Sequence, residues 1–127
     1  MCLDVITDPK PNPKAKGIGW KTLCHREGRL TSLFFYGRQY LAWCLRGWKW
    51  SQASRTVIAA SRADARGRQR YRAGIHVFRV RNDARAWQSE PDEVVRRIEW
   101  QGLICRGTQE GNDVLVVERA RLLKEKP

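Results

Sequence analysis

The clearest hydrophobic pattern of the chain is the stretch Ala-Gly-Ile-His-Val-Phe-Arg-Val that ends at Val80. In an extended segment successive side chains point to opposite faces, which places Ile75 and Val77 together. His76, Phe78 and Val80 then share the other face, so both faces are largely apolar. This pattern is typical of a strand at the centre of a sheet that is covered on both sides.

Several other stretches combine β-branched, aromatic and alternating residues in the way that strands do. Glu27–Arg29 predicts a turn between two of them, and Gly107–Asn112 predicts a turn between the last two. These strands are expected at residues 2–7, 20–24, 30–36, 93–105 and 113–123.

Three segments between these strands have a different character. Residues 8–14 contain three prolines and predict an extended loop. Residues 51–72 are polar and rich in arginine, which predicts a long, mobile and exposed connection. Asn82 is a good N-cap residue for a short helix that runs to Trp87, with Asp83 near its positive end.

Together these segments predict an α+β fold, with a mostly antiparallel sheet of five to seven strands and one or two short helices. A chain of 127 residues has the usual size of one domain, so we expect a single domain over residues 1–127. With 42% hydrophobic residues the chain can bury a core without a disulfide or a structural metal.

Charge is distributed unevenly along the chain, whose formal net charge is +12. Residues 1–87 carry eighteen basic and five acidic side chains, a net charge of +13, whereas residues 88–127 carry seven and eight. A bias of this size is more than solubility needs, and it attracts polyanions. The expected partner is therefore nucleic acid or an anionic host protein complex.

Two stretches supply the candidate binding residues. Arginines between positions 62 and 72 can fork onto phosphate oxygens, and tryptophans beside positive charge at positions 46–50 can stack on unpaired bases. The alternative interpretations are a solvated loop for the first stretch and rings that fill the core for the second. The candidate nucleic-acid or partner-binding residues are Arg62, Arg66, Arg68, Arg70, Arg72, Arg46, Trp48, Lys49 and Trp50.

The sequence offers little for catalysis. It has no phosphate-binding glycine loop, zinc-protease motif or nucleophile elbow, and its four cysteines lack metal-ligand spacing. Cys24 and His25 are strand neighbours whose side chains point apart, and His76 is expected to be a buried, satisfied histidine. We expect Cys2 to be an ordinary thiol. No cofactor, metal or catalytic residue is predicted.

The location follows from the same pattern. The apolar run at the start of the chain is too short for a signal peptide, and no run approaches the ~20 residues of a membrane span. We expect a cytoplasmic protein that does not interact with membranes and whose cysteines are reduced. The sequence leaves the oligomeric state open.

One group of proteins shares a motif with this chain. The segment Tyr71–Phe78, with its Gly-Ile-His-Val-Phe core, and the following Asp83, Ala84 and Trp87 resemble small uncharacterised phage and prophage accessory proteins. The remaining similar segments are Met1–Leu3, Gly19–Lys21, Val94-Val95, Gly102, Gly107 and Val114–Val117. The resemblance implies a viral setting, in which small basic proteins block host defence, anti-CRISPR proteins among them.

A second resemblance implies another activity. The strand with Gly-Ile-His-Val-Phe, followed by a short helix with Ala84 and Trp87, is similar to a part of the ADP-ribosyltransferase fold. That resemblance implies an NAD-consuming enzyme in which Glu118 would activate the acceptor. The chain departs from the family pattern at its first NAD-binding motif, because Trp20-Lys21 stands where an arginine or histidine is expected.

Overall fold

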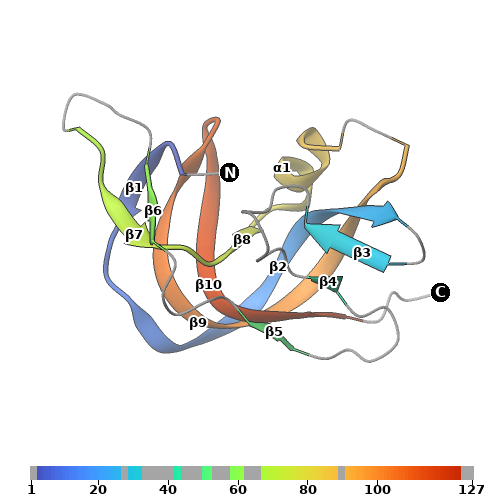
Figure 1. Ribbon diagram of the computed structural model, residues 1–127, viewed down its shortest axis with the longest axis horizontal. Helices are drawn as coiled ribbons and strands as arrows, with labels where there is room; N and C mark the ends of the chain where they lie inside the picture. Colours follow the sequence, from blue (N-terminus) through green and yellow to red (C-terminus); the bar gives the residue numbers. More distant parts are fainter. Residues whose placement is uncertain are drawn as a thin grey trace.

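The computed structural model describes residues 3–26, 29–32, 42–43, 50–52, 58–61, 67–88 and 91–123. These residues form a main antiparallel sheet, a separate pair of short strands and one short helix (Figure 1). In chain order the elements are β1 (Val5–Asp8), β2 (Asn12–Arg26), β3 (Arg29–Ser32), β4 (Ala42–Trp43), β5 (Ser51–Gln52), β6 (Ile58–Ala60), β7 (Arg70–Arg72), β8 (Ile75–Phe78), α1 (Arg81–Ala86), β9 (Glu93–Gln109) and β10 (Asn112–Leu122).

Four strands of the main sheet close into a ring. β9 pairs with β10 on one side and with β2 on the other, β10 pairs with β8, and β8 meets β2 at the Trp20–Phe78 pair. Figure 1 shows β2, β9 and β10 curving together through the middle of the molecule. β1 lies against the far end of β9, and the short strands β3, β4 and β5 extend the sheet. The predicted α+β class with a mostly antiparallel sheet is confirmed.

Apolar side chains from all four strands of the ring form its core. Gly19 lets β2 approach β8, because a Cβ atom there would lie 2.3 Å from Val77 Cγ1 and 2.9 Å from the carbonyl oxygen of Phe78. A side chain at this position would therefore force the two strands apart. The buried members of this first core are Leu23, Ile75, Val77, Ile98, Trp100, Leu115, Val117, Ala120 and Leu122.

A second core lies between the ring and the elements that cover it. It joins β1, β7 and α1 to the faces of β8, β9 and β10 that point away from the first core. α1 is held there by its buried Ala84, whose carbonyl oxygen accepts a hydrogen bond from the Thr22 hydroxyl. The buried members of this second core are Leu3, Ile6, Tyr71, Phe78, Ala84, Ile104, Cys105, Val114 and Val116.

β8 is the central strand that its pattern predicts. Ile75 and Val77 belong to the first core, Phe78 belongs to the second, and β8 has strands on both sides. Val80 was expected to share the covered face, and that expectation is wrong. β8 ends at Phe78, and the Val80 side chain is 52% exposed at the start of α1.

The β9–β10 hairpin is also confirmed, with a tighter turn than the sequence predicts. Glu110 and Gly111 are the two turn residues, and both have positive φ, 52° and 82°. Two consecutive residues of this conformation match the right-handed twist of the flanking strands, so pairing extends to Asn112 and Gln109. The strands therefore run further into the expected turn at positions 107–112.

Two expectations about loops are wrong in part. β2 begins at Asn12 rather than at Trp20, because the proline-rich segment runs beside β9 as an irregular extension with a register shift between Asn12 and Lys16. The segment 51–72 is not simply an exposed connection. β6 pairs with β7 there, and Tyr71 is buried in the second core.

The start of the helix differs as well. Val80 precedes the first helical residue, no side chain caps the helix, and Asn82 lies inside it. The backbone N–H groups of Asp83 and Ala84 bond to the Val80 carbonyl oxygen, so the first turn forms directly off the end of β8. Among the described residues, no helix is long and apolar enough to cross a membrane.

Candidate binding groove

A groove of about 400 Å³ lies where the β1–β2 connection and β7 meet the middle of β9 and β10. These elements come from distant parts of the sequence and lie together on the left side of Figure 1. Most of the lining is apolar, and three charged side chains interrupt it. The lining residues are Ile6, Pro9, Pro11, Pro13, Arg70, Tyr71, Arg72, Leu103, Ile104, Cys105 and Glu118.

The proline segment forms one wall of the groove. Pro9, Pro11 and Pro13 line it, and they alternate with Lys10, Asn12 and Lys14. Side-chain oxygens of Asp8 and Asn12 accept hydrogen bonds from the backbone N–H groups of the two lysines, at 3.0 and 3.2 Å. Fixed proline φ angles and these local bonds stiffen the wall, and Lys10 and Lys14 are exposed along it.

β7 forms the opposite wall, and Tyr71 fixes its position. The Tyr71 ring is buried, and its hydroxyl oxygen accepts a hydrogen bond of 2.9 Å from the Leu3 backbone N–H. Arg70 and Arg72 alternate with Tyr71 along the strand, so they share the side that does not face the second core. Arg70 is exposed and Arg72 is half-buried.

The two walls meet over an ion pair. Arg72 Nη1 lies 2.6 Å from Glu118 Oε1, which joins β7 to β10 inside the groove. Glu118 lies directly over Gly102, where a Cβ atom would come within 2.3 Å of Glu118 Oε2. Gly102 has φ 78°, and the β9–β10 register shifts between Val116 and Val117. This irregularity makes room for the carboxylate.

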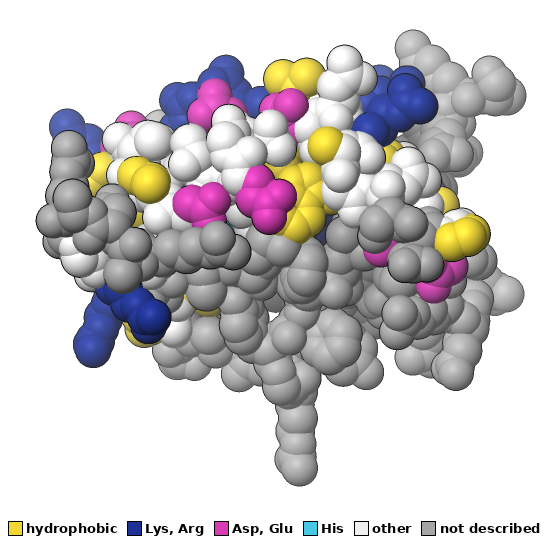
Figure 2. Space-filling view, turned by 90° about the horizontal axis from the view of Figure 1, so that it is seen from above, with side chains coloured by type: hydrophobic (Ala, Val, Ile, Leu, Met, Phe, Trp, Pro, Cys, Tyr) yellow, Lys and Arg dark blue, Asp and Glu magenta, His cyan; other side chains and the backbone are white. Residues whose placement is uncertain are grey.

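Other cations lie around the groove and at the opposite end of the molecule. Arg68 is exposed just before β7 and Arg70 is exposed at its first position, whereas Arg81 and Arg85 are exposed on α1. On the face that Figure 2 shows, Lys and Arg side chains lie in separate groups near the edges, with Asp and Glu side chains between them. The described side chains on this face form no single continuous basic patch.

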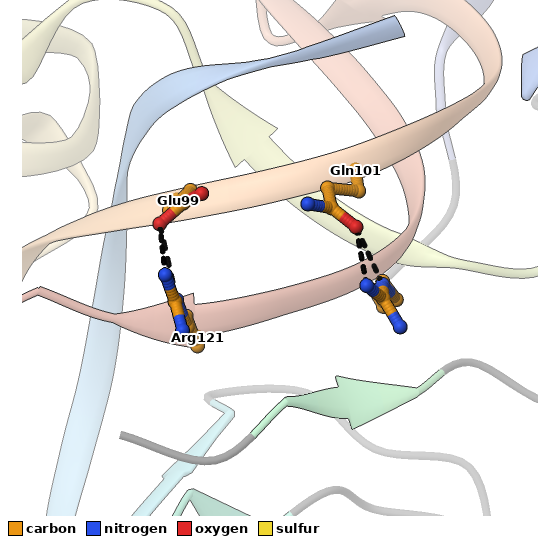
Figure 3. A network of polar contacts seen from close by, with 4 residues as sticks. Glu99, Gln101 and Arg121 are labelled. Atoms are coloured by element: carbon orange, nitrogen blue, oxygen red, sulfur yellow. Dashed lines mark hydrogen bonds and ion pairs between the residues drawn. The ribbon is translucent and has the colours of Figure 1, made fainter. Parts of the chain in front are cut away.

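Trp50 lies in a different place, beside β10. The guanidinium carbons of Arg119 and Arg121 are 4.5 and 4.6 Å from the centroid of its ring. The same two arginines are bonded to side chains of β9: Arg121 pairs with Glu99 at 2.8 Å (Figure 3), and Arg119 donates to Gln101. The arginines that contact Trp50 are therefore already engaged within the sheet.

The buried titratable groups serve the fold. Lys21 Nζ donates a hydrogen bond of 2.8 Å to the His76 carbonyl oxygen, and burial lowers the Lys21 pKa to about 8. Burial and the nearby Lys21 charge lower the pKa of His76 to about 3, and its Nδ1 lies 3.3 Å from Gln109 Oε1. Burial raises the pKa of the Cys105 thiol to about 11, which leaves it protonated and unreactive. His76 thus has a side-chain partner, as expected, but it is half-buried rather than fully buried.

The structure brings together only part of the predicted set. Arg70 and Arg72 line the groove and Arg68 precedes them, whereas Trp50 lies apart from them, against two arginines of β10. No pattern in the sequence indicates that the prolines form a wall of a groove. An isolated glycine in a strand pattern signals a bulge, so Gly102 could have indicated the irregularity in β9 over which Glu118 lies. Arg46, Trp48, Lys49, Arg62 and Arg66 lie outside the described residues.

Neither the placement of possible metal ligands nor comparison with known proteins assigns a role to the groove. Among the residues that the structure describes, no three His, Cys, Asp or Glu side chains are grouped closely enough to hold a metal ion. No protein-family model, curated protein or solved structure shows a significant match to this chain.

Proposed function

We propose that this protein is a non-catalytic, phage-type accessory protein that binds nucleic acid, or a host defence complex that contains it, through the groove and its surrounding cations. The observation that carries the proposal is the placement of Arg70 and Arg72 in a groove whose remaining lining, apart from Glu118, is apolar. The resemblance of the Gly-Ile-His-Val-Phe segment to phage accessory proteins supports the anti-defence role.

The chemistry of the groove suits a nucleic-acid chain. A guanidinium group presents several N–H donors in a plane and can bind two phosphate oxygens at once. Apolar walls accept the faces of sugars and unpaired bases, which lose little by leaving water. Lys10, Lys14 and Arg68 add positive charge on both sides of the groove, where a backbone that enters or leaves it would pass.

Binding is expected to be strongly salt-dependent. If about six phosphates are neutralised, affinity for an oligonucleotide should fall roughly 10³-fold between 50 and 200 mM salt. Fluorescence anisotropy with random single-stranded and duplex oligonucleotides measures this directly. Replacing Arg68 and Arg70 together with glutamine should weaken binding about tenfold more than the same change at Arg81 and Arg85, which alters the net charge equally. Binding that is absent or insensitive to salt would contradict the proposal.

A second candidate is an NAD-consuming enzyme similar to ADP-ribosyltransferases. The observation that favours it is the position of Glu118 inside the groove. Two observations count against it: a Glu118 oxygen is bonded to Arg72, and Lys21, at the divergent motif, donates to His76 and is not among the groove residues. The enzyme would release nicotinamide from NAD, and Glu118→Gln would abolish that release. A folded protein that leaves NAD intact rules this candidate out.

A further inference from the structure

The geometry of the groove points to a more specific ligand and to a means of controlling its binding, an inference that rests on the proposed function. We infer that the groove holds one unpaired nucleotide, and that Glu118 is an internal competitor which the phosphate of that nucleotide displaces from Arg72. The inference depends on the size of the groove, the division of its lining into apolar and charged parts, and the Arg72–Glu118 pair.

The size of the groove selects for one nucleotide. A volume of about 400 Å³ lies at the lower end of the range for small-molecule sites, roughly 300–1,000 Å³. A base that is paired and stacked in a duplex cannot enter a site of this size, because the second strand keeps the base from reaching the walls of the groove. An unpaired nucleotide, free or within a single strand, can enter.

The lining has a place for each part of a nucleotide. Leu103, Ile104 and the prolines offer apolar surface for the base and the sugar, as sites for unpaired bases do. Arg72 and Arg70 provide the donors for the phosphate from β7. Cys105 adds a protonated thiol, so the floor of the groove carries no charge of its own.

The Arg72–Glu118 pair places an anion where the phosphate would bind. A carboxylate oxygen 2.6 Å from Arg72 Nη1 accepts the same kind of charge-assisted hydrogen bond that a phosphate oxygen accepts. The pair keeps the guanidinium aligned while the groove is empty, and it opposes a second anion. Binding then requires an exchange of partners, so weak or misplaced anions are rejected.

A matched pair of variants tests the exchange. Glu118→Gln removes the competing charge and retains the shape of the side chain. Glu99→Gln removes the same charge from the Arg121 pair, which has similar geometry on another part of the sheet. We expect Glu118→Gln to tighten the binding of a fluorescent single strand of ten nucleotides about tenfold more than Glu99→Gln does. The two variants should bind a duplex with equal affinity.

The outcomes separate the inference from the proposed function. Equal affinities of the two variants, in a protein that still binds single strands, overturn the inference and leave the proposed function standing. No binding of any oligonucleotide by the wild type or either variant overturns both. Competition with a nucleoside monophosphate identifies a free nucleotide as a sufficient ligand, and competition by oligonucleotides alone identifies a strand. Equal competition by inorganic phosphate overturns the nucleotide assignment.

A second variant keeps the test decisive if Glu118→Gln does not fold. Pro11 is exposed on the wall of the groove, so Pro11→Trp should fill the groove without disturbing a core. Pro11→Trp should weaken single-strand binding at least tenfold. The control is Ile18→Trp, at an exposed position of β2 that does not line the groove, and it should leave binding unchanged. Unchanged binding by Pro11→Trp would show that the ligand does not use the groove.

Discussion

Gly19→Ala is expected to destabilise the protein by about 3 kcal/mol, the upper part of the range for overpacking a core. The new methyl group would lie 2.3 Å from Val77 Cγ1 and 2.9 Å from the carbonyl oxygen of Phe78. The side chain can turn away, but the carbonyl oxygen belongs to β8, which meets β2 only at this point of the ring. The strands must therefore separate. Urea unfolding followed by circular dichroism measures the loss.

Gly17→Ala is the matched control for this prediction, because Gly17 lies two residues away on the same face of β2. Its nearest neighbours are ring atoms of Trp100 at 3.0–3.1 Å, which belong to a side chain and can shift by a few tenths of an ångström. We expect a loss of about 1 kcal/mol or less. If Gly19→Ala costs no more than Gly17→Ala, the closure of the ring at β8 does not contribute to stability as described.

Acid is expected to destabilise the protein through His76. The pKa of its ring is about 3 in the folded protein and 6.5 in an unfolded chain, so the unfolded state binds an additional proton between these values. Stability is fully present above pH 6.5 and is lost as the pH falls toward 3. The slope is about 1.4 kcal/mol per pH unit, and the loss reaches at most about 5 kcal/mol.

Urea unfolding at a series of pH values from 7 to 3 tests this expectation. In His76→Gln the residue can still bond to Gln109 but cannot take up a proton. The variant should therefore lose only the stability that protonation of carboxylates removes, and its curve should be flatter than the wild-type curve below pH 6. Parallel curves for the two proteins would show that His76 is protonated as easily in the folded state as in the unfolded chain.

The parts of the fold that sequence could predict are those in which local pattern and tertiary role agree. β8 is apolar on both faces and lies between two strands, and β9 and β10 alternate around a turn that includes a glycine. In each of these strands, the side chains that are buried can be inferred from the residues of the strand itself. Such agreement between local preference and final environment makes a pattern informative.

The groove could not be predicted in the same way, because its parts come together only in the folded chain. Arg72 and Glu118 are 46 residues apart, and no local pattern links them. Tyr71 lies in an arginine-rich segment whose composition indicates a solvated loop, yet its hydroxyl bonds to Leu3, 68 residues away. The prolines suggested a loop because the sequence does not show that β9 lies beside them.

The order of the strands also determines when the chain can fold. The other two strands of the ring, β2 and β8, pair with β9 and β10, which are the last strands of the ring to be synthesised. While the first ninety residues emerge from the ribosome, β2 and β8 therefore lack their partners in β9 and β10, and the ring forms only after β10 has followed. During that interval the basic segments and their unpaired strand edges are open to chaperones, to nucleic acids and to other nascent chains.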